Sequence, residues 1–336
     1  MVSLNGVNNN KLRKVKIRRL NMEKTTQNRR TQFLTNRYVI FLGAMICCAL
    51  WGSAFPFVKR GMDLMKLSKS DTAGLILFAG ERFTLAGIFI IILGSIFSKN
   101  ILVPKTSEIK DVIILCIFQS VGQYTFYYIG IAHTSGVNTS IVDSLAYFLS
   151  IISACIIFRL EKMTTKKFLG CILGFTGVIL VNVTGNGFDF NMTCIGEGMI
   201  LLSAVSYSFS SVLAKIFSKK DNPVMLSGYQ FVLGGIIMLL GSLVAGARFR
   251  PFTGKALAVL IYLAFISTFA YSLWTILLKY NEVSKVSIYG FLNPVFGVIL
   301  SALILGETNE IGLNYIIALV IISIGITIVN KKQNRK

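Results

Sequence analysis

Residues Lys285–Glu307 read KVSIYGFLNPVFGVILSALILGE, an apolar stretch that is interrupted by Asn293-Pro294 and ends at Gly306-Glu307. A proline inside an apolar helix frees a backbone carbonyl and bends the axis, which lipid does not tolerate unless protein or a cavity surrounds the break. A weaker copy, TSIVDSLAYFLSIISACIIFRLE, lies 146 residues earlier at Thr139–Glu161. Two related segments at half-chain spacing indicate an internally duplicated membrane protein, an organisation typical of transporters.

The composition also indicates a membrane protein. Hydrophobic residues make up 54% of the chain and charged residues 14%, and the mean hydropathy is +0.69. Soluble chains carry about 25% charged residues. Apolar runs of about 20 residues predict an all-α protein with ten transmembrane helices. The predicted spans are 38–58, 73–97, 112–131, 137–158, 167–184, 195–217, 224–246, 256–278, 285–305 and 311–330.

The net charge of +20 is distributed unevenly along the chain. With a cytoplasmic N-terminus, 26 of the 34 lysine and arginine residues fall in the tails and loops on the inner side. This asymmetry follows the positive-inside rule, so both termini are expected in the cytoplasm. The basic N-terminal tail has no interleaved aromatic residues, and we therefore expect it to lie near anionic lipid headgroups and not to bind nucleic acid.

The spans divide the chain into five parts. Residues 1–37 form a basic cytoplasmic tail, in which Met22 is an alternative translation start. The other parts are a first five-helix repeat at 38–184, an outer linker at 185–194, a second repeat at 195–330 and a basic cytoplasmic tail at 331–336. The first apolar run begins only at Tyr38 and nine more follow, which argues against a cleaved signal peptide.

The two repeats match at several points. Trp51–Lys59 (WGSAFPFVK) corresponds to Tyr207–Lys215 (YSFSSVLAK), with the aromatic residue and the lysine in register. Gly80–Gly87 corresponds to Gly228–Gly235, and YTFY beginning at Tyr124 corresponds to YSLW beginning at Tyr271. Because each repeat has an odd number of spans, the second enters from the opposite side. The repeats are therefore inverted, and a site between them would lie near the membrane midplane.

These motifs resemble those of EamA-type proteins of the drug/metabolite transporter superfamily. The similarity extends over about residues 38–330 and is carried by Trp51-Gly52-Ser53, Arg82-Phe83 with Ala86, Gly196-Glu197 with Tyr207, and Asn293-Pro294 through Glu307. It implies ten spans in two repeats and a role in transport, with export the more common direction. The chain departs from the family pattern at Phe148, where a proline is expected. Pro56 and Pro294 are expected to break their helices.

Three ionisable residues, Glu81, Arg82 and Asp143, lie well inside predicted spans. Each costs about 2.5–3.5 kcal/mol at the centre of a helix on insertion scales, so each should face protein or water and have a partner. Arg82 and Asp143 lie about 14 Å and 9 Å from the same membrane face at 1.5 Å per residue. We therefore expect Arg82 to pair with Asp143 or Glu81, and the remaining acid to be available for proton coupling.

Polar and aromatic residues recur at helical spacing within the spans. Such residues either bond neighbouring helices to one another or line a cavity suited to small organic solutes. Glu161 and Glu307 are expected to bond neighbouring loops. The candidate substrate-binding residues are Trp51, Gln119, Gln123, Tyr127, Asp143, Tyr147, Tyr207, Tyr271, Trp274 and Asn293.

The residue pattern favours a secondary transporter that works by alternating access on a neutral, zwitterionic or cationic solute. A carrier of phosphorylated or nucleotide-sugar solutes and a non-transporting membrane scaffold remain as alternatives. The chain has no GxxxxGK[ST] loop for ATP hydrolysis and only one histidine, His133, and its six cysteines show no metal-ligand spacing. We therefore expect neither an enzyme nor a bound metal or cofactor. The spans 167–184 and 311–330 contain spaced glycines, so a homodimer that packs through these two spans is a further possibility.

Overall fold

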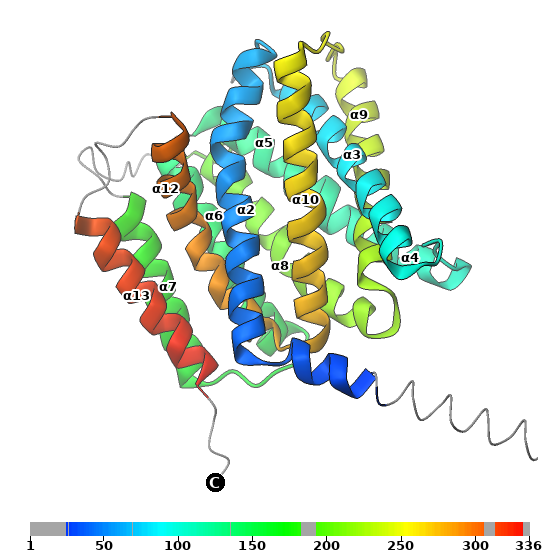
Figure 1. The fold of residues 1–336 in the computed structure, drawn as a ribbon. Coiled ribbons are helices and arrows are strands. Elements are labelled where there is room, and N and C mark those ends of the chain that lie inside the picture. The colour runs from blue at the N-terminus through cyan, green and yellow to red at the C-terminus, as the bar shows by residue number, and fades with distance from the viewer. Residues whose placement is uncertain are drawn as a thin grey trace, which may run out of the picture.

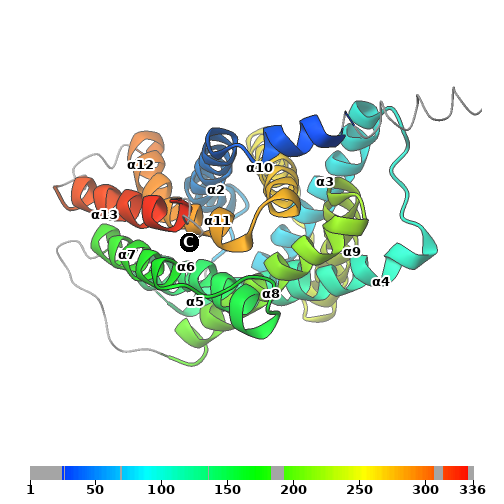
Figure 2. The same ribbon diagram turned by 90° about the horizontal axis from the view of Figure 1, so that it is seen from below.

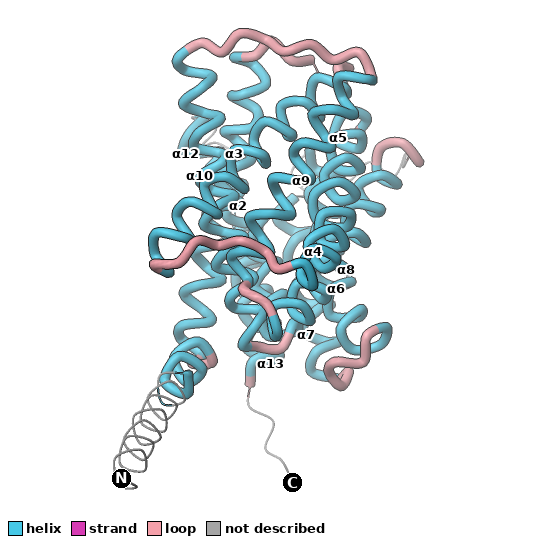
Figure 3. The backbone as a smooth tube through the Cα atoms, turned by 90° about the vertical axis from the view of Figure 1, so that its right-hand side faces the viewer, coloured by secondary structure: helices cyan, strands magenta, loops and turns pink. Residues whose placement is uncertain are grey.

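The computed structural model describes residue 25 and residues 27–68, 70–134, 136–182, 193–305 and 313–331. Within these ranges the chain consists of helices and connecting loops and contains no strand (Figure 3). Several predictions from the sequence fall outside the described residues. They concern Met22 and most of the N-terminal tail, nearly all of the 185–194 linker, Glu307, and most of the C-terminal tail.

The first half of the chain follows the predicted spans closely. Span three contains a π-helical segment, η1, and span four ends in a second one, η2. The elements are α2 (Arg37–Leu64), α3 (Thr72–Ser98), α4 (Thr106–Leu115), η1 (Cys116–Gly122), α5 (Gln123–His133), α6 (Gly136–Ile152), η2 (Ser153–Ile157) and α7 (Thr165–Asn182).

The second half does the same, and its span nine is built from three short segments. The elements are α8 (Glu197–Lys220), α9 (Pro223–Val244), α10 (Gly254–Tyr280), α11 (Val283–Ser287), the 3-10 helix η3 (Ile288–Leu292), α12 (Asn293–Leu305) and α13 (Leu313–Asn330). By length and hydropathy, eight helical stretches of the described chain could cross a bilayer, and Ile316–Asn330 is a shorter apolar helix. The protein is therefore a multi-pass membrane protein, and its helices are compatible with the predicted count of ten.

The helices begin where the sequence offers a suitable cap. The side chain of Asn36 accepts a hydrogen bond from the backbone N–H of Tyr38, and that of Asp71 accepts one from Gly74. Asn222 caps α9, and Pro223 follows in the first turn, where a missing N–H costs nothing. Thr253 caps α10 in the same way.

The two prolines expected to break helices behave differently. α2 continues through Pro56, so this residue does not end the helix. Pro294 is the second residue of α12, directly after the 3-10 turn η3, where its ring fits and no helical hydrogen bond is lost. The irregular backbone of span nine therefore precedes Asn293-Pro294 and is completely buried, from Ile288 to Leu292.

Two helix pairs from opposite halves pack through glycines, and they lie at opposite edges of the molecule (Figures 1 and 2). In the α3–α9 pair, a Cβ atom at Gly87 would lie 2.7 Å from the carbonyl oxygen of Gly228, and one at Gly80 would lie 3.0 Å from that of Gly235. In the α7–α13 pair, a Cβ at Gly325 would lie 2.8 Å from the carbonyl oxygen of Gly170. The glycine faces considered for a homodimer are therefore occupied within one chain.

Equivalent positions of the two repeats meet each other across the molecule. In the repeat alignment Gly80 corresponds to Gly228 and Gly87 to Gly235, but in the structure Gly80 lies against Gly235 and Gly87 against Gly228. An antiparallel crossing about a twofold axis requires this reversed order. The hydroxyls of Tyr124 and Tyr271, which are equivalent in the repeat alignment, are hydrogen-bonded to each other. This packing is compatible with the predicted inverted repeat.

The described chain begins and ends on one face of the molecule (Figures 1 and 3). α2 starts there at Arg37, and α13 ends there at Asn330. We call this the termini face and the opposite side the far face. Under the positive-inside prediction the termini face is cytoplasmic.

The substitution Gly87→Ala should destabilise the α3–α9 pair. Its Cβ would lie 2.6 Å from the backbone nitrogen of Val232, so one helix would have to move. Overpacking of this kind typically costs about 1–3 kcal/mol. We expect a lower unfolding midpoint for the purified variant in detergent.

The matched control is Gly241→Ala in α9, where nothing lies within 4 Å of the added Cβ. It should leave the unfolding midpoint unchanged or raise it slightly, because alanine favours a helix over glycine. Equal midpoints for the two variants would contradict the assigned role of Gly87.

Candidate functional site

A cavity of about 450 Å³ lies between the helices of both halves. This volume falls in the range of small-molecule sites. Its wall contains eight aromatic residues, among them Trp51 from α2, Tyr147 from α6, Tyr207 from α8 and Tyr271 from α10. Further lining residues are Ala54, Phe55, Val58, Lys59, Met62, Leu75, Arg82, Gln123, Tyr124, Tyr127, Tyr128, Ile131, Thr134, Thr139, Asp143, Ala146 and Asn293.

The cavity lies in the half of the molecule near the far face. α2 contributes residues only from Trp51 to Met62, in the half of the helix that ends at the far face. α6 starts at the far face and contributes residues between Thr139 and Tyr147, whereas its last five residues do not line the cavity. The cavity thus extends from the middle of the bundle toward the far face.

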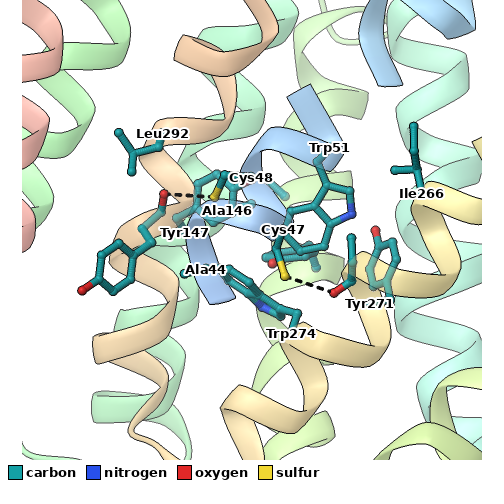
Figure 4. Close-up of a cluster of buried hydrophobic side chains, with 14 of the residues drawn as sticks. Ala44, Cys47, Cys48, Trp51, Ala146, Tyr147, Ile266, Tyr271, Trp274 and Leu292 are labelled. Atoms are coloured by element: carbon teal, nitrogen blue, oxygen red, sulfur yellow. Dashed lines mark hydrogen bonds between the residues drawn. The ribbon is translucent and has the colours of Figure 1, made fainter. Parts of the chain in front are cut away.

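Most of the predicted binding residues line this cavity. Trp51, Gln123, Tyr127, Asp143, Tyr147, Tyr207, Tyr271 and Asn293 are all in its wall. Gln119 and Trp274 are buried but do not line it. Trp274 packs edge-on against Trp51 at 5.0 Å between ring centroids, and it therefore supports a wall residue (Figure 4).

The position of Gln119 has a physical cause. Spacing of four residues predicts that Gln119 and Gln123 share a face of a regular α-helix. In the structure, Gln119 lies in the π-helical segment η1, whose wider turn changes the direction of the side chains relative to α5. Only Gln123, the first residue of α5, lines the cavity.

The floor of the cavity, at the middle of the bundle, is a compact group of rings (Figure 4). Trp51 packs edge-on against Tyr271 at 5.1 Å, and Tyr147 packs edge-on against Tyr207 at 5.8 Å. The side-chain amide of Asn293 donates a hydrogen bond to the hydroxyl of Tyr147 at 3.1 Å. Asn293 and Tyr147 are equivalent in the alignment of the two repeats, 146 residues apart, so the two halves meet at this bond.

The expected pairing of Arg82 is not formed. Its Nε and Nη2 atoms donate to the hydroxyl of Ser267 on α10, at 3.2 and 3.0 Å. No ion pair joins Arg82 to Asp143 or to Glu81 in the part of the chain that the structure describes. Arg82 and Asp143 both line the cavity, whereas Glu81 does not.

The cavity wall also contains residues beyond those predicted from the sequence. Tyr128 follows Tyr124 by one helical turn, and both line the cavity, so helical spacing from Tyr124 was the available signal. Lys59 also lines it and lies near the end of α2 at the far face. Ser267, the partner of Arg82, has no signal in the sequence because it lies 185 residues away.

A group of bonds closes the bundle at the termini face, and we call it the latch. The carboxylate of Glu161, just beyond η2, accepts hydrogen bonds from the backbone N–H of Val283 and from the hydroxyl of Ser284 at 2.5 Å, at the start of α11. Lys167 of α7 pairs with Glu161 at 3.0 Å and with Glu282 at 3.4 Å. Glu161 therefore bonds a neighbouring loop, as predicted, and joins span four to span nine.

Other contacts strengthen the same closure. Lys215 of α8 donates to the backbone carbonyls of Leu278 and Asn281, and the Asn281 side chain donates to the carbonyl of Leu34 at 2.9 Å. Burial would raise the pKa of Glu282, but its hydrogen bond to Lys285 and the charges of Lys285 and Lys167 lower it below the usual value. Glu282 is therefore ionised at neutral pH and available to pair with Lys167.

Comparisons with known proteins agree with this architecture. The profile of the EamA-like transporter family matches residues 38–183 and again residues 194–331. A crystal structure described only as that of a protein has a TM-score of 0.70 and 16% sequence identity, and the match covers 88% of this chain and 97% of that chain. This similarity shows a shared fold.

Relatives with similar sequences are named as transporters. A protein of Archaeoglobus fulgidus described as an uncharacterized transporter is 25% identical over 267 residues, which are 78% of this chain and 87% of the relative. The uncharacterized transporter YyaM of Bacillus subtilis (strain 168) is 28% identical over 283 residues, which are 79% of this chain and 85% of the relative. The family profile matches most of the chain, and this protein belongs to the EamA-like transporter family of membrane transporters.

Proposed function

We propose that this protein is a secondary transporter that exports a small organic solute across the cytoplasmic membrane by alternating access. The observation that carries the proposal is the cavity of about 450 Å³ that extends from the middle of the bundle toward the far face, with Asp143 and Arg82 in its wall. Intramembrane charges are costly and mark substrate or ion pathways in transporters. Family membership supports the transport step itself.

The charges of the wall favour a zwitterionic solute. Asp143 and Arg82 belong to different helices and do not pair with each other, so each can meet an opposite charge on a solute. An ammonium group would bind at Asp143 and a carboxylate at Arg82. The surrounding tyrosine and tryptophan rings would cover the apolar part of such a molecule.

The presence of Lys59 in the cavity wall favours a second candidate function, that of a carrier of phosphorylated solutes. This lysine lines the cavity together with Arg82, so the wall contains two basic residues and one acid. Lys59 lies near the far face, whereas Asp143 and Arg82 lie deeper. We therefore place the zwitterion first, with the phosphorylated solute as the alternative.

The position of the cavity supports a state open toward the outside of the cell. It extends toward the far face, while the latch and the bonds of Lys215 and Asn281 close the termini face. Export would require the latch to open so that the solute enters from the cytoplasm. The hydrogen bond between the Ser284 hydroxyl and the Glu161 carboxylate must break at that step.

A screen of solutes tests the proposal directly. The purified protein would be heated with tyrosine, tyramine and uridine monophosphate, since a ligand that binds the folded state raises the unfolding midpoint. We expect tyrosine or a related zwitterion to raise the unfolding midpoint of the protein most. The stabilising solute would then be tested for transport in proteoliposomes, where we expect it to be transported. Stabilisation by uridine monophosphate alone would favour the phosphorylated-solute carrier, and transport of none of the three would contradict the proposal for these solute classes.

The substitution Asp143→Asn should abolish proton coupling. We propose that the Asp143 carboxylate binds a proton and the solute in alternation, because among the described residues it is the intramembrane acid that lines the cavity. Uptake into proteoliposomes should depend on an imposed proton gradient and fall at least tenfold when a protonophore collapses it. In the variant, collapse of the gradient should have no effect. Persistence of coupling in Asp143→Asn would rule out this role.

Glu81→Gln is the matched control for this experiment, since Glu81 lies in a span but not in the cavity wall. It should retain gradient-dependent uptake. Loss of coupling in Glu81→Gln and not in Asp143→Asn would assign the coupling proton to Glu81 instead.

The substitution Glu161→Gln should open the termini face more often. A neutral amide accepts weaker hydrogen bonds from Val283 and Ser284 and no longer pairs with Lys167. Access would be measured as the rate at which a thiol reagent labels Ser287→Cys, a buried position of α11, in a Cys194→Ser background. We expect labelling to be several-fold faster with Glu161→Gln.

The control is Glu108→Gln, which removes a capping carboxylate near the same face but outside the latch. It should not change the labelling rate. If Glu161→Gln also leaves the rate unchanged while the protein stays folded, the latch is not what closes this face.

A further inference from the structure

Among the residues that the structure describes, four in the cavity wall hold a buried polar atom with no hydrogen-bond partner. One is the hydroxyl of Tyr207, which can either donate or accept a hydrogen bond. The other three atoms each have a fixed role as donor or acceptor. They are Nε1 of Trp51, Oε1 of Gln123 and Oδ1 of Asn293. Each residue is at least nine-tenths buried, with exposed fractions of 9%, 9% and 8%. All three lie near the middle of their spans, on α2, α5 and α12.

Unpaired buried polar atoms are uncommon, because each loses its bonds to water without replacing them. Here three, from three different helices, belong to residues that line one cavity. Some of the other polar atoms nearby are used: the amide nitrogen of Asn293 donates to Tyr147, and the hydroxyls of Tyr124 and Tyr271 bond each other. The hydroxyl of Tyr207 and the indole N–H of Trp274 are unpaired as well, but Trp274 does not line the cavity. The unpaired atoms are therefore the ones that remain for a bound molecule.

The rings around these atoms fix their positions. Trp51 is held between Tyr271 at 5.1 Å and Trp274 at 5.0 Å, both edge-on, so its indole N–H cannot turn away freely. Asn293 is held by its bond to Tyr147 and follows the buried turn η3. Groups that are held before binding lose little freedom when a ligand arrives, which favours selective recognition.

We propose that the floor of the cavity is a subsite for an uncharged group that both donates and accepts hydrogen bonds, such as a primary carboxamide, carried on a flat ring. Its carbonyl would accept from Trp51, and its N–H groups would donate to Gln123 and Asn293. The rings of Trp51, Tyr147, Tyr207 and Tyr271 would pack against the flat part. This inference rests on the proposed function, since it describes how the transport cavity selects its solute.

The chemistry of the three atoms argues against other groups at this point. An indole N–H cannot accept from an ammonium group, and amide oxygens cannot accept from a carboxylate. A methyl-terminated ring would bury all three atoms without a partner. A single hydroxyl has one hydrogen to donate and would leave one of the two amide oxygens unpaired. A carboxamide supplies one acceptor and two donors.

Three molecules of nearly the same shape test the subsite: nicotinamide, 3-acetylpyridine and 3-isopropylpyridine at pH 8. The first offers both a donor and an acceptor on its side group, the second only an acceptor, and the third neither. Binding to the full-length protein in detergent would be measured by calorimetry. We expect the affinity to fall about tenfold at each step, as for the loss of a hydrogen bond to a buried group.

Variants then locate the binding. Asn293→Leu and Trp51→Phe each replace a polar side chain by an apolar one of similar branching or ring type, so each should reduce the preference for nicotinamide over 3-isopropylpyridine about tenfold. Thr84→Val is the control, because Thr84 also holds a buried unpaired oxygen but does not line the cavity. It should keep the full preference.

The outcomes separate the subsite from the proposed function. Equal affinity for the three molecules, or an unchanged preference in both Asn293→Leu and Trp51→Phe, would overturn the subsite. The preference for nicotinamide, if present in a protein that transports no solute in proteoliposomes, would uphold the subsite while the transport proposal fails.

Discussion

The structure depends on one constraint, which is that hydrocarbon offers no hydrogen bonds to a polypeptide. Every backbone polar group in the bilayer must be satisfied within the protein, so the described chain is built from helices. The irregular turn η3 is allowed because Ile288 to Leu292 are completely buried by surrounding helices. The same constraint drives the polar side chains inward, and Arg82, Gln123 and Asn293 all meet at one cavity.

Close approach of the helices is the second requirement, and glycine supplies it. The hydrophobic effect does not drive helices together in lipid, so contact depends on close packing. Gly80 and Gly87 let α3 meet α9, and Gly170 and Gly325 let α7 meet α13. These two pairs form opposite edges of the molecule, and the helices between them surround the cavity.

The two halves are equivalent in outline and different in chemistry at their contact. Tyr147 and Asn293 occupy equivalent positions, yet one offers a hydroxyl and the other an amide, and they bond each other. Span nine has a proline after its irregular turn, whereas span four has Phe148 in the corresponding segment and Asp143 one turn earlier. A fully symmetric pair could not present a carboxylate on one side of the cavity and an amide on the other.

The sequence alone determined much of this protein: hydropathy indicated its helical class and the approximate ends of the spans, and short motifs such as Asn293-Pro294 indicated the family. These features are local, because a run of about 20 apolar residues or a cap such as Asn222-Pro223 acts within its own segment. Most of the charged and amide residues of the cavity wall were also predictable, namely Arg82, Gln123, Asp143 and Asn293, since polar side chains in apolar helices have few other places to go. Lys59 and most of the apolar lining were not.

Only the tertiary structure decided how these residues are paired. Arg82 bonds Ser267 across 185 residues of sequence and does not pair with Asp143, because the packing of α3 on α10 determines what lies within its reach. The π-helical turn η1 separates Gln119 from the cavity that Gln123 lines, and helical spacing could not reveal that turn. The sequence by itself thus determined which polar groups the membrane would force inward. Long-range packing decided which of them bond to each other and which remain free for a solute.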